Sequence, residues 1–471
     1  MKRQIIPAIL VVLLLLSGCG DGFPIGDRDL RIIEVDGWMI DHYFSRNSDY
    51  LITLSGHLKH DLSRDLRLTP DTLGVYRVGN FEKIFEYTSP YRIWRTYTCA
   101  DPDILIHAED KFPEDEDCDL VFRSISSGEE IARLWVRNLP DSWNDTDFHC
   151  DMEENLIYFN QGNCSIAIAD GSTGAVMLTI EHECIAGWSP LYVQKEHDRI
   201  IRLDDLMNTF YVFRLSSGEL LGTVELWPNP YELQFTTNEW ELPDGNMLFS
   251  INGKKNDITG LYFMIVDLDQ MTVTNETVLQ GCSYPADRAL DMENGRFIAS
   301  FSDFGMCLDT DGDDIGVFDY INGEVVSQKD TSAHGQGPFV PILPLNLIYQ
   351  EDWLAEGAPS ATFYSYPDLE IVHQGDAPIG AEDHFYISDG NLLIMESYFS
   401  DQFAVYDLDN FRTLDRFHLC DNVGANTLTV SRNQKWAAVK CNGIEDDDDD
   451  GNIGPPPEGA GVAIVGLDGY R

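Results

Sequence analysis

The chain has 471 residues, 43% of them hydrophobic, which is ample for a large buried core. Its 80 acidic residues outnumber its 31 basic residues, and the formal net charge is −49. A field of this sign repels phosphate backbones and anionic lipid headgroups, so it argues against nucleic-acid binding and electrostatic membrane docking, and it attracts cations and basic protein surfaces. An exposed domain that only has to remain soluble would show the same acidity.

The first residues have the pattern of an export signal. Lys2 and Arg3 precede an apolar stretch, residues 5–16, that is too short to span a bilayer as a helix. Leu16-Ser17-Gly18-Cys19 follows and resembles the lipobox of bacterial lipoproteins, in which the cysteine becomes the acylated N-terminus. The resemblance implies that 1–19 is a signal peptide cut before Cys19, and that acyl chains anchor the protein to a membrane. An ordinary secretory signal that ends in cysteine is the alternative.

The residues after the signal divide into a tether and one domain. Residues 20–29 are rich in Gly and Asp and are predicted to be flexible, and residues 30–471 are predicted to form a single domain. By the same lipoprotein resemblance, Gly20 after the cysteine, in place of Asp, favours the outer membrane as the location of this exported, envelope-anchored protein.

A repeated module organises residues 30–471. Each copy has an apolar run, a variable insert, a second apolar run, a turn and a further run. The runs alternate and are rich in β-branched and aromatic residues, which predicts half-buried strands and no helices. Several of the turns supply glycine for a positive φ: Gly128, Gly174, Gly218 and Gly323. The second run recurs roughly every 40 to 60 residues, a period typical of propeller blades, at 75–78, 121–124, 166–170, 211–215, 264–268, 316–320, 362–366, 404–408 and 462–466.

The number of modules predicts the fold class. Each of these nine runs is preceded by a partner run, so the sequence predicts an all-β propeller of eight or nine four-stranded blades, with one unit as an embellishment in the smaller ring. The chain ends soon after the ninth pair, whereas Leu30–Val35 is an apolar run without a module of its own. We therefore expect this N-terminal strand to complete the last blade and close the ring.

The repeat resembles the WD40-like, YVTN-like and quinoprotein-like propellers of bacteria. Asp170 followed by Thr173-Gly174, and Gly128-Glu129 leading to Trp135, resemble the quinoprotein blade motif. The tryptophan docking pattern of that motif is not repeated from module to module. We therefore expect no organic cofactor.

Nine cysteines remain besides Cys19, which predicts disulfides with one thiol left over in an exported chain. Cys282 and Cys420 each precede the first strand of a module, and Cys307 and Cys441 each follow the second strand. These positions put Cys282 with Cys307, and Cys420 with Cys441, on the same face of the ring. We expect the bridges to stabilise the fold, because no Cys-x-x-Cys pair indicates redox chemistry.

The other five cysteines leave two assignments open. Cys164 and Cys184 flank one hairpin almost symmetrically, which predicts a bridge across it. Cys99 then pairs with Cys118, and Cys150 is left over. Alternatively, Cys150 pairs with Cys164, and Cys184 is left over.

Three inserts between the paired runs are acidic: Glu109–Asp119, Asp303–Asp314 and Glu445–Asn452. Because they occupy the same slot of the module, they predict a polyacidic rim on one face.

Within these inserts, two segments are candidates for calcium binding. Asp309, Asp311, Asp313 and Asp314 place carboxylates around Gly312 in the way that wraps oxygen ligands round Ca²⁺, and they resemble the loops of thrombospondin type 3 repeats. The second segment contributes Asp448, Asp450 and Asn452. A solvated run of charge is the alternative in both cases.

Two function classes fit these features. The first is a non-catalytic binding or scaffold protein of the envelope, whose partner is an envelope protein or a basic peptide or protein patch; it resembles in layout the lipoprotein propeller of the β-barrel assembly machinery. The second is a propeller enzyme, a hydrolase, lyase or quinoprotein, with its site in the central channel. We prefer the first, because no catalytic motif occurs, and we predict apolar packing where the innermost strands face the channel.

Overall fold

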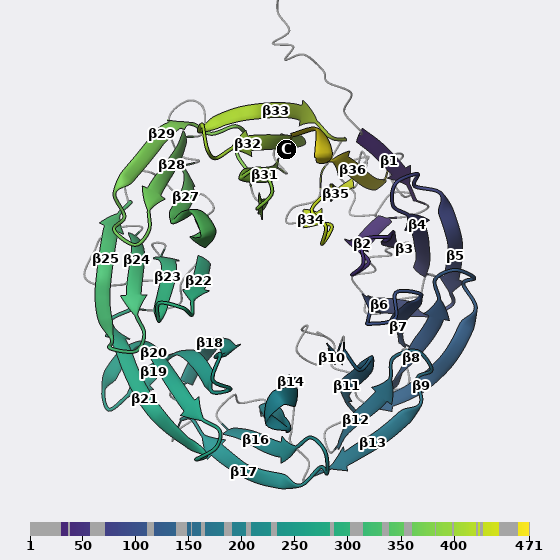
Figure 1. The fold of residues 1–471 in the computed structure, drawn as a ribbon, viewed down its shortest axis with the longest axis horizontal. Helices are drawn as coiled ribbons and strands as arrows, with labels where there is room; N and C mark the ends of the chain where they lie inside the picture. Colours follow the sequence, from purple (N-terminus) through teal and green to yellow (C-terminus); the bar gives the residue numbers. More distant parts are fainter. Residues whose placement is uncertain are drawn as a thin grey trace, which may run out of the picture.

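The computed structural model describes residues 30–35, 38–56, 71–110, 117–137, 148–151, 153–161, 165–182, 191–203, 209–227, 233–282, 287–301, 314–331, 339–352, 360–381, 383–397, 400–420, 423, 427–441 and 460–470. Within these residues, nine four-stranded antiparallel sheets stand around a common axis, with the first strand of each innermost (Figure 1). The predicted all-β propeller is confirmed, with nine blades.

Each blade runs from an innermost first strand to an outermost fourth strand. Blades 1 to 3 contain, in that order, β2 (Trp38–Phe44), β3 (Tyr50–Gly56), β4 (Asp71–Arg77) and β5 (Lys83–Ser89); β6 (Arg92–Thr98), β7 (Ile104–Asp110), β8 (Asp117–Ser124) and β9 (Glu130–Arg137); β10 (Phe148–Asp151), β11 (Leu156–Asn160), β12 (Ser165–Asp170) and β13 (Val176–Glu181). Blades 4 to 6 contain β14 (Leu191–Gln194), β15 (Arg199–Leu203), β16 (Thr209–Arg214) and β17 (Leu220–Glu225); β18 (Leu233–Glu241), β19 (Met247–Lys255), β20 (Ile258–Asp267) and β21 (Thr272–Gln280); β22 (Asp287–Asp291), β23 (Arg296–Phe301), β24 (Asp314–Asp319) and β25 (Glu324–Asp330). Blades 7 to 9 contain β26 (Phe339–Ile342), β27 (Leu347–Asp352), β28 (Ser360–Ser365) and β29 (Ile371–Asp376); β30 (Asp383–Ile387), β31 (Leu392–Ser397), β32 (Gln402–Asp407) and β33 (Arg412–His418); β34 (Thr429–Val430), β35 (Trp436–Cys441), β36 (Gly461–Gly466) and β1 (Leu30–Glu34). Three short 3-10 helices also occur in the described residues: η1 (Lys195–His197), η3 (Leu343–Leu345) and η4 (Asp468–Tyr470).

The first strand of the chain closes the ring, as predicted. β1 is the outermost strand of blade 9 and pairs antiparallel with β36, from Leu30 opposite Val465 to Glu34 opposite Gly461. The backbone N–H of Val35 extends the ladder by donating to the carbonyl of Ala460, at 3.0 Å. Blade 9 is therefore built from both ends of the described chain, and β36 has no open edge.

The core lies between the blades. Among the residues that the structure describes, the buried apolar side chains form nine clusters, and each cluster joins two neighbouring blades. The cluster that joins blade 9 to blade 1 includes Ile33, Met39 and Val462. Because every interface has such a cluster, the ring is closed by packing as well as by strand pairing.

The middle strands differ from the half-buried strands that we predicted. All the residues of β15 and of β31 are buried, on both faces of the strand. Each blade packs between two neighbours, so neither face of a middle strand reaches water. The alternation is clearer on outermost strands such as β25, where exposed and half-buried residues alternate towards the end.

The turns between the third and fourth strands match the sequence prediction. Gly128, Gly174, Gly218 and Gly323 have φ between 67° and 73°. The aspartate that ends a third strand fixes such turns: Asp170 Oδ1 accepts hydrogen bonds from the backbone N–H groups of Ser172 and Thr173 and from the Thr173 hydroxyl. These bonds, led by the hydroxyl, lower the pKa of Asp170. Part of the acidity of the chain therefore has a structural role.

Candidate functional site

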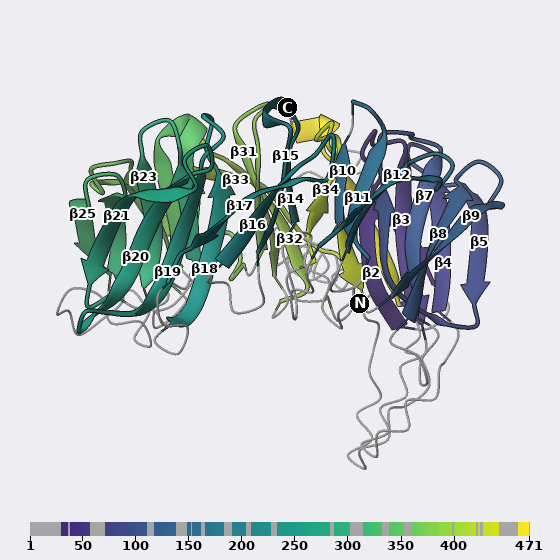
Figure 2. The same cartoon turned by 90° about the horizontal axis from the view of Figure 1, so that it is seen from below.

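The strand order gives the ring two different faces. Connections from first to second strands and from third to fourth strands are short, and they share one face, which we call the turn face. Connections from second to third strands, and from one blade to the next, share the opposite face, which we call the loop face. The three longest connections within blades all join a second strand to a third strand, and so belong to the loop face: 57–70, 302–313 and 442–460. The ring in side view shows the two faces (Figure 2).

The three acidic inserts all lie in the predicted slot, between the second and third strands of blades 2, 6 and 9. The expected rim is wrong for the two ends of the first insert, however. Glu109 is 0% exposed and Asp119 is 2% exposed. Both face blade 1, and the guanidinium of Arg133, on β9 of their own blade, donates to both carboxylates, at 2.6 and 2.8 Å.

The contacts around Glu109 form a polar network between blades 1 and 2. The Tyr87 hydroxyl of β5 donates to Glu109 at 2.6 Å, and the Arg123 guanidinium lies 3.5 Å over the Tyr87 ring. Burial alone would raise the pKa of Glu109, but the hydrogen bonds from Tyr87 and Arg133 outweigh it and lower the pKa. Burial lowers the pKa of the neighbouring His107 to about 3. This network joins two blades.

Buried and half-buried carboxylates at the loop face connect other blades in a similar way. Asp71 of blade 1 accepts a hydrogen bond from the backbone N–H of Ile93 in blade 2, at 2.7 Å. Glu351 of blade 7 accepts one from Ala381, which precedes blade 8, at 2.9 Å, and Asp383 of blade 8 accepts one from Leu428 at 2.9 Å. These acids therefore act as links between neighbouring blades.

Most of the predicted calcium ligands lie outside the described residues: Asp309, Asp311, Asp313, Asp448, Asp450 and Asn452. Asp314 is the first residue of β24 and pairs with Phe301 and Asp330 in the ladder at the loop face. Among the residues that the structure describes, no three His, Cys, Asp or Glu side chains gather closely enough to hold a metal ion.

One predicted disulfide is present as expected. Cys420 and Cys441 are bonded, with their Cα atoms 6.1 Å apart. Cys282 is also disulfide-bonded, and its expected partner Cys307 lies outside the described residues, as do Cys164 and Cys184.

The assignment of Cys99 is corrected by the structure. Cys99 is bonded to Cys150, and neither predicted alternative, Cys99 with Cys118 or Cys150 with Cys164, is present. Cys99 follows β6 and Cys150 lies in β10, so the two stand near the turn-face ends of neighbouring innermost strands. Cys118 is buried near the start of β8, at the loop-face end of its blade, and keeps its thiol.

A repeated turn on the turn face escaped prediction from the sequence. Ser45-Arg46-Asn47 follows β2, and Ser431-Arg432-Asn433 follows β34, so the same three residues begin the first turn of blades 1 and 9. In both turns the serine hydroxyl donates to the asparagine side-chain oxygen, at 2.7 and 2.8 Å. The two turns share this hydrogen bond and place an arginine at the same position. The repeated Ser-Arg-Asn was the signal that could have revealed them.

These two arginines line one pocket, which we call the arginine pocket. It has a volume of about 120 Å³ and is lined by residues that include Arg46, Asn47, Thr98, Cys99, Pro102 and Arg432. No lining residue carries a carboxylate. Burial lowers the pKa of Arg46, and the positive charge of Arg432 lowers it further. The two guanidinium groups therefore repel each other electrostatically.

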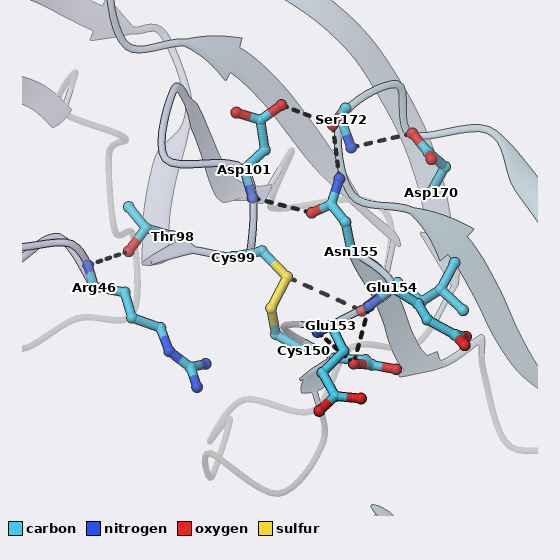
Figure 3. Close-up of a disulfide and its surroundings, with 12 residues drawn as sticks. Arg46, Thr98, Cys99, Asp101, Cys150, Glu153, Glu154, Asn155, Asp170 and Ser172 are labelled. Carbon is cyan, nitrogen blue, oxygen red and sulfur yellow. Dashed lines mark hydrogen bonds between the residues drawn. A yellow bond between two sulfur atoms is a disulfide. The ribbon is translucent and has the colours of Figure 1, made fainter. Parts of the chain in front are cut away.

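Contacts between blades hold the pocket together. The backbone N–H of Asn433 donates to the Ser48 hydroxyl, and the backbone N–H of Arg46 donates to the Thr98 hydroxyl, at 3.2 and 3.1 Å. The Cys99–Cys150 disulfide continues this arc to blade 3 (Figure 3). Burial lowers the pKa of His149, the neighbour of Cys150, and the charge of Arg46 adds to this against the opposing effect of Asp151.

The prediction of apolar packing where the innermost strands face the channel stays a prediction, and a polar contact joins two of these strands. Tyr192 of β14 donates its hydroxyl hydrogen to the Glu239 carboxylate of β18. Burial raises the pKa of Glu239, and Arg288 of β22 opposes this. These polar groups lie in blades 4 to 6, away from the arginine pocket in blades 9, 1 and 2.

Cys19 and the rest of residues 1–29 lie outside the described residues. In the part of the chain that the structure covers, no helix is both long and apolar enough to cross a bilayer.

The nine four-stranded sheets around one axis define the class of the protein as a nine-bladed β-propeller. No family model matches the chain, and no curated protein matches it. A solved structure of a eukaryotic initiation factor has a TM-score of 0.51 at 8% identity, over 79% of this chain and 87% of that one. The C-terminal WD40 domain of Sif2 has a TM-score of 0.48 at 9% identity, over 93% of this chain and 98% of that one. Dihydro-heme d1 dehydrogenase NirN, in complex with DHE, has a TM-score of 0.45 at 11% identity, over 88% of this chain and 84% of that one. At such identities the likeness concerns the fold alone.

Proposed function

We propose that this chain is a lipid-anchored, non-catalytic binding protein of a bacterial cell envelope, and that its loop face binds a basic patch on another envelope protein. The observation that carries the proposal is the separation of the two faces. The long connections within blades and all three acidic inserts belong to the loop face. Loops held on a rigid scaffold are where proteins most often bind their partners.

The anchor follows from the lipobox resemblance at Cys19. Leu30 begins β1 at the turn face, on the outside of the ring, since it pairs with Val465 near the end of β36. The proposed tether of residues 20–29 would therefore join the ring at the turn face, opposite the long loops. The two disulfides and the bonded Cys282 agree with an oxidising compartment.

The partner can be tested by removing charge from one face at a time. Changing Asp448, Asp449 and Asp450 to Asn neutralises three loop-face acids. The matched control changes three exposed turn-face acids, Glu129→Gln, Glu293→Gln and Asp368→Asn. Each chain is immobilised, exposed to detergent-solubilised envelope proteins and washed at rising salt.

We expect the wild type and the control to retain the same basic protein, and the loop-face variant to lose it. Salt should release it as well, because exposed charges are screened beyond about 10 Å at 0.1 M ionic strength. Equal retention by all three chains, or equal loss from both variants, would rule out the loop face as the binding surface.

Calcium is the second part of the proposal, with Asp309, Asp311 and Asp313 as ligands. Chelation by EDTA should then lower the melting temperature. The expected loss is about 2.7 kcal/mol when calcium had been present at about a hundred times its Kd. A chain with all three residues changed to Asn should melt at the same temperature with and without EDTA. If the wild type also melts identically in EDTA and in calcium, no calcium stabilises the fold.

A further inference from the structure

The arginine pocket gathers positive charge in a strongly acidic protein. The chain has 80 acidic and 31 basic residues, so most cations have carboxylates to pair with. Arg46 and Arg432 nevertheless have no ion-pair partner among the residues that the structure describes. Each arginine comes from its own Ser-Arg-Asn turn, Arg46 on blade 1 and Arg432 on the adjacent blade 9. Both line the same pocket. Two like charges held together without a counter-charge favour the binding of an anion.

The pocket also supplies a neutral donor and a rigid frame. Thr98 lines it, and the hydroxyl oxygen accepts the backbone N–H of Arg46, which leaves the hydroxyl hydrogen for a ligand. Cys99, also in the lining, is fixed by its disulfide to Cys150. Hydrogen bonds tie the turns of blades 9, 1 and 2 together. The backbone of the two turns that carry the arginines is therefore held in place before any ligand arrives.

We propose that the arginine pocket binds a phosphate group, with Arg46 and Arg432 as its two charged ligands. Guanidinium groups form paired, charge-assisted hydrogen bonds with phosphate oxygens, and two of them balance the charge of about −1.5 to −2 on a phosphate monoester at pH 7. The volume of about 120 Å³ suits a small group. The site lies on the turn face, so it is separate from the loop-face binding proposed above and does not rest on it.

The source of the phosphate is either a free phosphate compound or the headgroup of a lipid. The test uses the chain from residue 20 onward, which contains every described residue and lacks the acylated cysteine. In one arm, sodium phosphate is titrated calorimetrically at constant ionic strength, with sodium chloride as the control. In the other arm, the chain is sedimented with phosphatidylcholine vesicles, with or without phosphatidic acid.

The variants are Arg46→Gln, Arg432→Gln and the double variant. Arg77→Gln is the matched control, because Arg77 is exposed and ends a strand at the turn face of blade 1. Both pocket arginines are exposed, so the variants should fold, and circular dichroism melting checks this. We expect each single change to weaken phosphate binding about tenfold or more, from the loss of charged hydrogen bonds. The double variant should bind no phosphate, and Arg77→Gln should bind as the wild type does.

Saturable binding of sodium phosphate that the double variant loses supports a free phosphate compound as ligand. Binding only to vesicles with phosphatidic acid, again lost in the double variant, supports a lipid headgroup. Absence of binding in both arms, or binding of equal strength in the wild type and the double variant, would overturn the proposal. None of these outcomes bears on the loop face.

Discussion

Replacing Gly461 by alanine should open the ring between its first and last strands. A Cβ atom at this position would lie 2.1 Å from the carbonyl oxygen of Ile33 and 3.0 Å from its carbonyl carbon. Both atoms belong to the backbone of β1, which cannot give way as a flexible side chain would. The closing strand must move, and overpacking of this kind costs about 1 to 3 kcal/mol, or more when strand pairing is lost with it.

The change can be followed by urea unfolding and by trypsin cleavage after Arg31, which lies within β1. We expect a lower midpoint and faster cleavage for Gly461→Ala. Gly469→Ala, at the end of the same blade, is the control, because a Cβ there would meet no atom within 4 Å. If both variants unfold at the same urea concentration and Arg31 stays protected, β1 does not form the closure described above.

Replacing Asp71 by asparagine should stabilise the protein at neutral pH. Burial raises the pKa of Asp71 to about 6, although the backbone N–H of Ile93 and the charge of Arg92 act in the opposite direction. The unfolded chain would have a pKa near 3.9, so holding this carboxylate ionised in the folded state costs up to about 3 kcal/mol above pH 6. Asparagine has the same shape, carries no charge and can still accept the Ile93 hydrogen bond.

The pH dependence has a definite sign. In the wild type, the protonated side chain favours the folded state below about pH 4, and this advantage is lost as the pH rises to 6. The gain from Asp71→Asn in urea unfolding should therefore be largest at pH 7.5 and vanish near pH 4. Asp71→Ala, which leaves the Ile93 N–H without its acceptor, should destabilise at both values. A loss of equal size for Asp71→Asn at both pH values would contradict the raised pKa.

The repeat and the closure were predictable because they depend on patterns local to the sequence. Middle strands buried between blades need apolar runs, and four hairpins between third and fourth strands mark their positive φ by a glycine such as Gly174. In four other such hairpins a non-glycine residue has a positive φ: Phe81, Met271, Leu369 and Phe411. The strand β1 could be placed because it was an apolar run without a module. Trp135 shows where the motif resemblance misleads, since this side chain is 52% exposed on the outermost strand β9 and does not pack between blades.

Features that depend on neighbours in different blades could not be predicted in this way. Cys99 pairs with Cys150 because the ends of two innermost strands meet at the turn face. The bridge expected across the hairpin of Cys164 and Cys184 had left Cys118 as the partner of Cys99. Glu109 looked like part of a solvated acidic run and is buried against blade 1. Arg46 and Arg432 lie at opposite ends of the sequence, and only the closed ring brings them together.

A cryo-electron microscopy map of the chain tests the central claim most directly, because it shows the blades and the closing strand at once. We expect nine four-stranded blades around one axis, with residues 30–34 paired to residues 461–465 in the last of them. An open ring, a ring with residues 30–34 elsewhere, or two separate globules would contradict it.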